Sequence, residues 1–315
     1  MRDAAAWCRL RAVETRAGVA LQHTDGAFLG AGGVRITWQS WQDATAPTRA
    51  HVVVAHGAAE HGGRYLRLAR ELAPRGFPVW AIDHRGHGRS EGRRVLIDRF
   101  THAVADVDAL VEHVSEADLG RPVFLLGHSM GGAISLLYAL AHQDRLTGLI
   151  LSATAASDAG VAAPLRVADR VLGLGRILSR VAPSLGIVAL DPEGLSRDAA
   201  EVRAYIADPL VTVGKLPART AGELSAAIRG PFRRELGAIT LPTLLIHGDA
   251  DPLVPPVAST LVRDGLGGDD VTLHVYPEHR HELFNELPAD RERVLADVSD
   301  WLDARAPRRT GRFTR

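Results

Sequence analysis

The clearest chemical signal in the sequence is a serine set between two glycines, in the run Gly127-His128-Ser129-Met130-Gly131. Apolar residues before it (123–126) predict a short buried strand, and Ala- and Leu-rich residues after it (133–141) predict a helix. A strand, a tight turn and a helix in this order favour a nucleophile elbow, which lifts the serine hydroxyl above a sheet. We therefore predict that Ser129 is a catalytic nucleophile. The alternative is a tight strand–helix connection without chemistry.

A serine hydroxyl attacks near neutral pH only with a base beside it and an acid behind the base. After such an elbow, the acid and then the base follow in the chain, on loops that end later strands. The first of these loops follows a predicted strand at 244–247 and contains Asp249 and Asp251. We favour Asp251 as the acid because it lies deeper in its loop. We expect Asp249 to hold the turn.

The second loop follows a predicted strand at 271–276 and contains two histidines, His279 and His281. We favour His281 as the base, because the residues after it, 282–284, provide an apolar anchor that would fix the ring. Both loops lie at the carboxyl ends of their strands, where α/β sheets place their ligands.

The reaction also needs two backbone N–H groups that stabilise the oxyanion of the transition state. One is expected from Met130, the residue after the nucleophile. The other is expected from Ala58, in the loop after the β-branched strand 52–55, because Gly57 allows the backbone to turn its amide inward. We expect His56 to brace this loop rather than to act as a second base.

Composition limits the class of partner. The chain of 315 residues is 46% hydrophobic, enough for one large α/β domain with an insertion or for two domains. Lys plus Arg and Asp plus Glu number 37 each, so no net charge attracts nucleic acid. We expect a small neutral substrate and no nucleic acid partner, and the oligomeric state stays open.

The single cysteine, Cys8, excludes an internal disulfide and a cysteine-based metal site. The 14 histidines show no close metal-ligand spacing, so we expect no metal and no organic cofactor. No apolar run reaches the roughly 18 residues of a membrane span, and residues 1–20 lack a signal-peptide core. We expect a cytoplasmic protein, with peripheral membrane contact left open.

Short buried strands alternate with helices along the chain, which predicts a mostly parallel sheet covered on both faces. An alternating strand at 34–41 could form an opening hairpin. The alternation stops after Ser152 and resumes at Leu244, and we find no strand signal in residues 155–190. The predicted divisions are a poorly ordered extension (1–25), an α/β core (26–154 and 231–305), a helical cap or lid (155–230) and a tail (306–315).

Several segments resemble the monoacylglycerol lipase family, bacterial type, of the α/β-hydrolase superfamily. They are the nucleophile run and residues 56–65 and 83–92 in the core, with residues 195–198 and 205–210 in the insertion. The resemblance spans about residues 26–305. It implies the α/β-hydrolase fold and agrees with Ser129, Asp251 and His281 as the triad.

The resemblance also implies a fatty monoester substrate, an acyl tunnel under the cap and a small polar pocket for glycerol. Its match places Glu60, Arg64, His128 and Tyr205 in that pocket. Alternatively, Glu60 and Arg64 pair with each other and brace the loop. The family usually has glycine where this chain has Glu278, a carboxylate that either disturbs the nearby base or points to solvent.

We therefore expect a serine carboxylester hydrolase that cleaves monoacylglycerols to fatty acid and glycerol through an acyl-enzyme intermediate. The alternatives are a lysophospholipase, a general short-chain esterase or a peptidase of the same superfamily, and a catalytically inactive receptor or scaffold. The apolar first half of the cap, 161–190, carries Arg166, Arg170, Arg176 and Arg180. It would either dock on a lipid surface or simply cover the active site.

Overall fold

The computed structural model describes residues 9–14, 20–157 and 174–307 of the chain. Its centre is a nine-stranded sheet in the order β1-β2-β3-β5-β4-β6-β7-β10-β11. The strands are β1 (Arg9–Glu14), β2 (Ala20–Leu29), β3 (Arg35–Asp43), β4 (His51–Ala55), β5 (Val79–Asp83), β6 (Val123–His128), β7 (Gly148–Ser152), β10 (Thr243–Gly248) and β11 (Val271–Tyr276). The run from β5 to β11 is parallel, whereas β1, β2 and β3 join it in antiparallel pairs.

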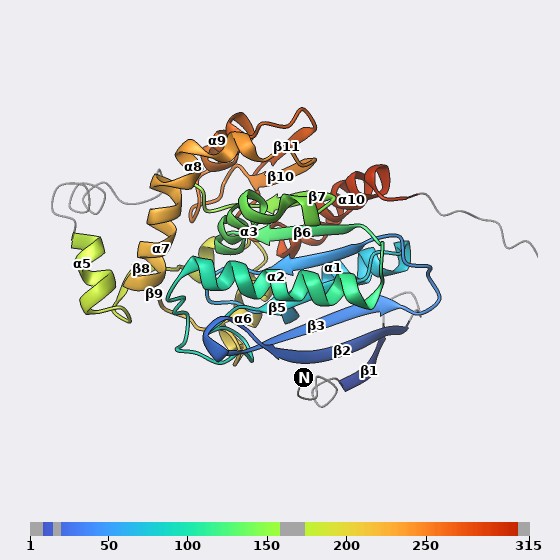
Figure 1. Ribbon diagram of the computed structural model, residues 1–315, viewed down its shortest axis with the longest axis horizontal. Helices are drawn as coiled ribbons and strands as arrows, with labels where there is room; N and C mark the ends of the chain where they lie inside the picture. Colours follow the sequence, from blue (N-terminus) through green and yellow to red (C-terminus); the bar gives the residue numbers. More distant parts are fainter. Residues whose placement is uncertain (1–8, 15–19, 158–173, 308–315) are drawn as a thin grey trace, which may run out of the picture.

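Helices cover both faces of this sheet, as the alternation of strands and helices predicted (Figure 1). One face packs against α2 (Phe100–Ala117) and α3 (Met130–His142), which share a buried cluster with Val53, Leu125 and Leu149. The other face packs against α1 (Leu66–Leu72) and α10 (Pro288–Arg305). A further helix, α9 (Val257–Gly265), connects β10 to β11. The fold is the α/β-hydrolase fold that the sequence predicted.

Because β4, β6, β10 and β11 run parallel, their carboxyl ends lie at one edge of the sheet. The loops that contain the predicted functional residues all begin there. The central strands are buried on both faces, which explains their short, β-branched and nearly continuous apolar runs.

The N-terminal part of the chain differs from the expectation of a poorly ordered extension. Residues 9–14 form β1, which pairs antiparallel with β2 from Arg9 opposite Asp25 to Glu14 opposite Ala20. The opening hairpin that we expected is formed by β2 and β3, and β2 begins at Ala20, within the segment expected to be poorly ordered. The missed strand gains its backbone hydrogen bonds from the open edge of β2, which no local sequence pattern reveals. Residues 1–8 and 15–19 lie outside the described residues.

The described part of the insertion contains α5 (Leu174–Val181), α6 (Ala199–Ala207), α7 (Ala218–Arg229) and α8 (Pro231–Arg234). It also contains β8 (Gly186–Ala189) and β9 (Lys215–Pro217), which pair antiparallel in a separate two-stranded sheet. The prediction that residues 155–190 contain no strand was therefore wrong. A four-residue strand inside an Ala-, Val- and Leu-rich run has no periodicity that separates it from a helix. Residues 158–173, with Arg166 and Arg170, and residues 308–315 of the tail lie outside the described residues.

Candidate active site

The predicted nucleophile occupies the sharp turn between β6 and α3. Ser129 has φ 51° and ψ −116°, a conformation that a non-glycine residue adopts only under strain. Its N–H donates to Ser152 O on the neighbouring strand at 2.9 Å, and its carbonyl oxygen accepts from Ala133 N. The surrounding sheet and helix thus hold the strained residue in place, with its side chain half-buried.

Steric crowding explains the two glycines beside the serine. A Cβ at Gly131 would lie 2.1 Å from Ala55 O and 2.4 Å from His56 O, both backbone atoms. A Cβ at Gly127 would lie 2.7 Å from Gly131 O. No larger residue fits at either position without displacement of the main chain. The tightness of the turn therefore requires glycine at positions 127 and 131.

Asp251 and His281 form a hydrogen-bonded pair. His281 Nδ1 donates to Asp251 Oδ2 at 2.7 Å, and both side chains are buried. The other carboxylate oxygen, Asp251 Oδ1, accepts the backbone N–H groups of Leu253 at 2.8 Å and Val254 at 3.0 Å. These bonds hold the carboxylate toward the ring and leave His281 Nε2 as the nitrogen that can accept a proton.

The competing residues in the two loops have other partners. Asp249 Oδ1 accepts the N–H of Glu278 at 2.6 Å, so Asp249 holds the turn, as we expected. His279 Nδ1 donates to Pro277 O at 2.7 Å, within its own loop. Glu278 points to solvent: its side chain is 84% exposed, and Glu278 Oε2 lies 3.5 Å from Arg197 Nη1.

The base lies beside the nucleophile turn. The ring centroid of His281 is 4.7 Å from that of His128, the residue immediately before Ser129. His128 Nδ1 donates to Ser152 O at 3.1 Å, which fixes its ring under the base. The structure thus brings together the nucleophile turn, His281 and Asp251 from three separate strand ends.

The charges in the site favour a protonated base. Burial works to lower the pKa of His281, but the charge and hydrogen bond of Asp251 more than offset it and raise the pKa. The carboxylates of Glu282 and Glu60 act in the same direction. Burial works to raise the pKa of Asp251, but His281 and His247 hold it far below its ordinary value. An ionised acid therefore faces a ring that gains stability when it takes a proton.

The predicted oxyanion loop passes close over the nucleophile. A Cβ at Gly57 would lie 2.9 Å from the His128 ring and 3.3 Å from Ser129 Cβ. Among the described residues, the N–H groups of Ala58 and Met130 donate no hydrogen bond to another part of the chain. Both amides are therefore available to a bound oxyanion.

His56 braces this loop, as we expected. Its Nδ1 donates to Gly57 O at 2.7 Å, and its Nε2 accepts the N–H of His84 at 3.0 Å. Burial lowers its pKa to about 4, so the ring stays neutral at pH 7. A neutral ring that uses both nitrogens in this way cannot serve as a second base.

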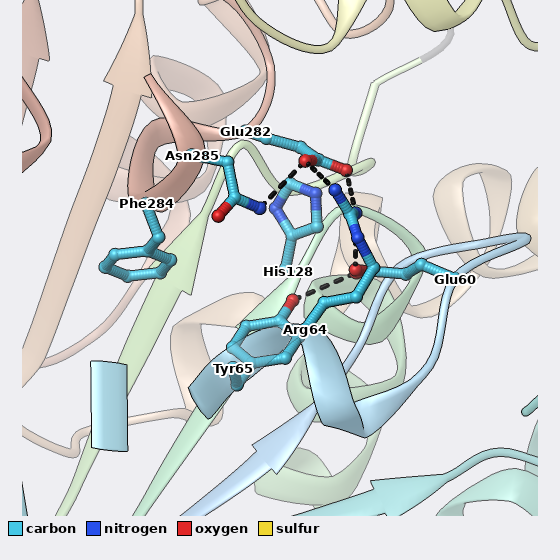
Figure 2. A pocket seen from close by; sticks show the side chains of 7 residues that line it. All are labelled: Glu60, Arg64, Tyr65, His128, Glu282, Phe284 and Asn285. Atoms are coloured by element: carbon cyan, nitrogen blue, oxygen red, sulfur yellow. Dashed lines mark hydrogen bonds and ion pairs between the residues drawn. The ribbon is translucent and has the colours of Figure 1, made fainter. Parts of the chain in front are cut away.

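A small polar pocket lies beside the base (Figure 2). Its lining consists of Glu60, Arg64, Tyr65, His128, Glu282, Phe284 and Asn285. Three of the four predicted pocket residues are among them, and the fourth, Tyr205, contacts Arg64, whose Cζ lies 4.7 Å from the centre of its ring. Arg64 also donates to Glu60 Oε2 at 3.1 Å, so the predicted alternative, in which these two residues pair, is present as well.

Sequence reasoning missed Glu282 and His247. We had taken Glu282 as part of an apolar anchor, yet its buried carboxylate faces the polar pocket and binds Arg64. His247 Nε2 donates to Val254 O at 2.8 Å and lies 3.2 Å from Asp251 Oδ2. Two sequence features could have indicated these residues. Glu282 directly follows the predicted base, and His247 lies at the end of a buried strand.

The insertion holds the loop that contains the base. The backbone N–H of Glu282 donates to Leu195 O at 2.8 Å, and that of His281 donates to Gly194 O at 3.4 Å. The hydroxyl of Ser196 donates to Asn285 O at 2.7 Å. The position of the base therefore depends on a segment of the chain about 90 residues earlier.

The described residues contain neither a metal site nor a membrane-spanning helix. In residues 9–14, 20–157 and 174–307, no three His, Cys, Asp or Glu side chains are grouped so that they could hold a metal ion. Within these ranges, no helix is long and apolar enough to cross a membrane.

Comparison with known proteins gives a consistent set of relatives. The family model for serine aminopeptidase, S33, matches residues 46–288. A monoacylglycerol lipase from Mycolicibacterium smegmatis is 38% identical over 284 residues, which cover 90% of this chain and 98% of that protein. A monoglyceride lipase from Homo sapiens is 34% identical over 278 residues, covering 88% of this chain and 90% of that protein.

Solved structures show the same likeness. The crystal structure of a monoacylglycerol lipase from Paleococcus ferrophilus superposes with a TM-score of 0.75 at 29% identity, covering 86% of this chain and 99% of that chain. A monoglyceride lipase variant from Saccharomyces cerevisiae, solved with a substrate analogue, superposes with a TM-score of 0.78 at 23% identity. That second match covers 96% of this chain and 97% of the yeast chain, and at this identity it supports the fold alone.

Proposed function

Because the chain belongs to the monoacylglycerol lipase family of the α/β-hydrolase superfamily, we propose that it hydrolyses monoacylglycerols to a fatty acid and glycerol. One observation supports a serine hydrolase mechanism in this chain. A buried Asp251–His281 pair, 2.7 Å apart, lies beside the strained turn that presents Ser129.

The reaction starts with proton transfer. Asp251 holds the Nδ1 proton of His281, so Nε2 is free to take the proton of the Ser129 hydroxyl as its oxygen attacks the ester carbonyl. The ionised Asp251 stabilises the imidazolium that forms. His281 then returns the proton to the departing glycerol oxygen, and an acyl group remains on Ser129.

Water completes the cycle. His281 takes a proton from a water molecule, which attacks the acyl-enzyme, and then returns that proton to Ser129 as the fatty acid leaves. In both steps the amides of Ala58 and Met130 donate to the oxyanion. The bonds that hold Gly57 and His56 keep this loop in place before the substrate arrives.

Two regions beside Ser129 suit the two halves of the substrate. We place the glycerol end of the substrate at the polar pocket of Figure 2, near Glu60, Arg64, His128 and Tyr205. Its free volume of about 10 Å³ holds no more than one water molecule, so its side chains must move apart to admit a glycerol hydroxyl. A small apolar cluster joins the oxyanion loop to the insertion. It consists of Ala59, Val95 and Leu216, with Ala58, Leu190 and Ala221 packed against it. This cluster offers the acyl chain an apolar surface under the insertion.

A substrate panel tests the proposal. It compares monoacylglycerol, lysophospholipid, p-nitrophenyl esters and an aminoacyl amide, with the wild-type protein and with Ser129→Ala. We expect the highest kcat/KM for monoacylglycerol and a loss of at least about a thousandfold for the variant. Ser115→Ala is the matched control, because that hydroxyl only donates to Val111 O within α2.

Other outcomes contradict the proposal in different ways. A clear preference for lysophospholipid, short esters or the amide would assign the chain to another activity of the same fold. Activity of Ser129→Ala equal to wild type would exclude the mechanism. Failure of a fluorophosphonate probe to label Ser129 in the wild-type protein would favour a receptor or scaffold.

We further propose that the insertion contacts a lipid surface. Ile177 and Val181 on α5 are 53% and 72% exposed, and Leu185, in the segment after the helix, is 49% exposed. The exposed side chain of Arg180 lies among them. Apolar groups beside a cation suit the interface of a membrane, where the acyl substrate is found.

Co-sedimentation with phosphatidylcholine vesicles tests this contact. We expect Ile177→Asp and Val181→Asp to reduce the bound fraction several-fold and to leave hydrolysis of a p-nitrophenyl ester unchanged. Leu261→Asp is the matched control, because Leu261 is equally exposed (53%) but lies on α9. Absence of binding by the wild-type protein would refute the contact.

A further inference from the structure

Glu282 follows the base directly, and its carboxylate is held by Arg64. Arg64 Nη2 donates to Glu282 Oε2 at 2.6 Å, and Nη1 donates to Glu282 Oε1 (Figure 2). The Glu282 side chain is only 6% exposed. Asn285 Nδ2 donates to Glu282 Oε2 at 2.9 Å, so the carboxylate has three donors. A buried fork of this kind fixes both partners in orientation.

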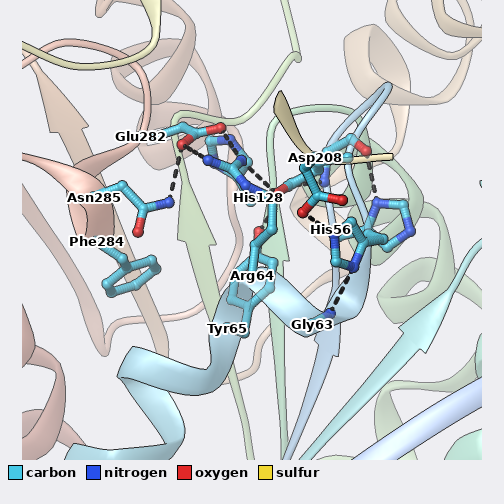
Figure 3. Close-up of polar contacts among 12 residues, drawn as sticks. His56, Gly63, Arg64, Tyr65, His128, Asp208, Glu282, Phe284 and Asn285 are labelled. Carbon is cyan, nitrogen blue, oxygen red and sulfur yellow. Dashed lines mark hydrogen bonds and ion pairs between the residues drawn. The ribbon is translucent and has the colours of Figure 1, made fainter. Parts of the chain in front are cut away.

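The same guanidinium reaches the oxyanion loop. Arg64 Nη1 donates to Glu60 Oε2 at 3.1 Å. The other oxygen, Glu60 Oε1, accepts the N–H of Gly57 at 2.6 Å and the hydroxyl of Tyr65 at 3.0 Å. A continuous series of hydrogen bonds therefore joins the base-bearing loop to Gly57, the residue before Ala58. Figure 2 shows its links from Glu282 through Arg64 to Glu60, and Figure 3 shows Arg64 and Glu282 together with His56.

The hydrogen-bonded group of Glu282, Arg64 and Glu60 carries a net negative charge. It contains two carboxylates and one guanidinium, so one negative charge remains unbalanced next to His281. Burial works to raise the pKa of Glu282, but the charge and hydrogen bonds of Arg64 hold it below its ordinary value, so the group stays ionised. The other titratable groups that face His281 are Asp251 and His128. Burial lowers the pKa of His128 to about 4. His128 is therefore neutral at pH 7.

We propose that Glu282 is a positioning residue for the hydrolysis: through Arg64 it locks the base loop to the oxyanion loop, and its charge stabilises the protonated form of His281. The inference rests on the proposed serine hydrolase mechanism, but not on the identity of the ester. Arg64 serves this lock directly, because its hydrogen bonds go to the carboxylates of Glu282 and Glu60.

The test is the pH dependence of kcat/KM for a p-nitrophenyl ester, measured for Glu282→Gln and Glu282→Asp. The acid limb is the range in which activity falls as His281 takes up a proton. Glu282→Gln removes a negative charge beside His281, so the acid limb should move to lower pH by about 0.5–1 unit. Its kcat should fall about tenfold, because the loop loses the paired hydrogen bonds between the Arg64 guanidinium and the Glu282 carboxylate. Glu282→Asp keeps the charge and should keep the acid limb of the wild type.

Glu278→Gln is the matched control, since this carboxylate is four positions away in the same loop and 84% exposed; its profile should equal the wild type. If Glu282→Gln does not fold, Glu60→Gln removes the other carboxylate of the chain and should move the acid limb in the same direction. An acid limb that stays in place, or equal loss of activity in the Gln and Asp variants with no shift, would refute the proposal. Failure of the wild type to hydrolyse monoacylglycerol would overturn the proposed substrate alone.

Discussion

At the level of single residues, Glu278 has a strained backbone conformation close to the catalytic histidine. Its φ is 62°, in the left-handed region that favours glycine. The carboxylate lies in solvent and away from the base, with Arg197 3.5 Å away. Its backbone N–H, which binds Asp249, is the part that the turn requires.

The first prediction concerns this strain. Glu278→Gly should raise the free energy of unfolding by about 1 kcal/mol, because glycine adopts the left-handed conformation without a Cβ clash. The exposed ion pair with Arg197 is worth little. Urea denaturation measures the change. Glu278→Ala loses the same carboxylate but keeps the Cβ, so it should show no gain; an equal gain in both variants would contradict the explanation.

The second prediction separates the acid from its neighbour. Asp251→Asn should lower kcat/KM by about ten-thousandfold, since the ring loses the carboxylate that orients it and stabilises its charge. Because Asp251 raises the pKa of His281, any residual activity should have its acid limb at lower pH. Asp249→Asn keeps an oxygen that can accept the N–H of Glu278, and its activity should stay within a few-fold of wild type. Comparable losses in both variants would contradict the assignment.

At the scale of elements, the segment of the insertion before α6 binds the start of α10 and the base loop. Arg197 Nε donates to Glu286 Oε2 at 3.0 Å, and Arg197 also pairs with Asp290. Glu286 is fully buried, and its other oxygen accepts the N–H of Arg280 at 2.7 Å. The insertion is therefore a structural support of the loop that contains His281.

The third prediction tests this support. Arg197→Ala should lower the free energy of unfolding by about 2–3 kcal/mol, because it leaves the buried Glu286 carboxylate without its cation. Arg197→Lys keeps a charge and should recover part of the loss. Thermal or urea unfolding gives the difference. Stability equal to wild type in Arg197→Ala would show that the pair does not hold the loop.

At the scale of the whole molecule, neutral histidines are buried under the oxyanion loop. The rings of His56 and His84 are 4.6 Å apart, and those of His56 and His87 are 5.3 Å apart. Burial lowers the pKa of all three, to about 4 for His56 and about 3 for His87. A proton on any of these rings would be buried beside two other histidines.

The fourth prediction follows from these lowered pKa values. In the unfolded chain the histidines take up protons near pH 6.5, whereas in the folded protein they resist until far lower pH. Stability is therefore full above pH 6.5 and is lost as the pH falls toward 4. For His56 and His87 the loss between pH 7 and pH 5 is on the order of 2 kcal/mol each.

His281 acts in the opposite sense. Its raised pKa gives stability that is full below pH 6.5 and is lost as the pH rises through its folded value. His56, His84 and His87, together with His128, whose pKa is also lowered, should outweigh this single raised histidine. The urea midpoint should therefore be lower at pH 5 than at pH 7, and an equal or higher midpoint at pH 5 would contradict the prediction.

Much of the active site followed from local sequence. The turn around Ser129 could be predicted because its glycines are required by steric contacts with residues nearby in the sequence. A Cβ at Gly127, for example, would clash with Gly131 O. Short β-branched runs predicted the parallel strands, since strands buried on both faces must be apolar throughout. Parallel strands place their carboxyl ends at one edge, so the order of Ser129, Asp251 and His281 along the chain already implied a common site.

The directions of the remaining groups depend on contacts between distant parts of the chain. The direction of Glu282 depends on Arg64, a residue 218 positions away, and β1 depends on the free edge of β2. The strand β8 likewise depends on β9, and the pairing of Asp251 with His281 rather than with His279 depends on how two loops pack. Sequence patterns express which face of an element is buried. They do not express which distant partner satisfies a buried charge or an open strand edge, because that choice is made by contacts that exist only in the folded chain.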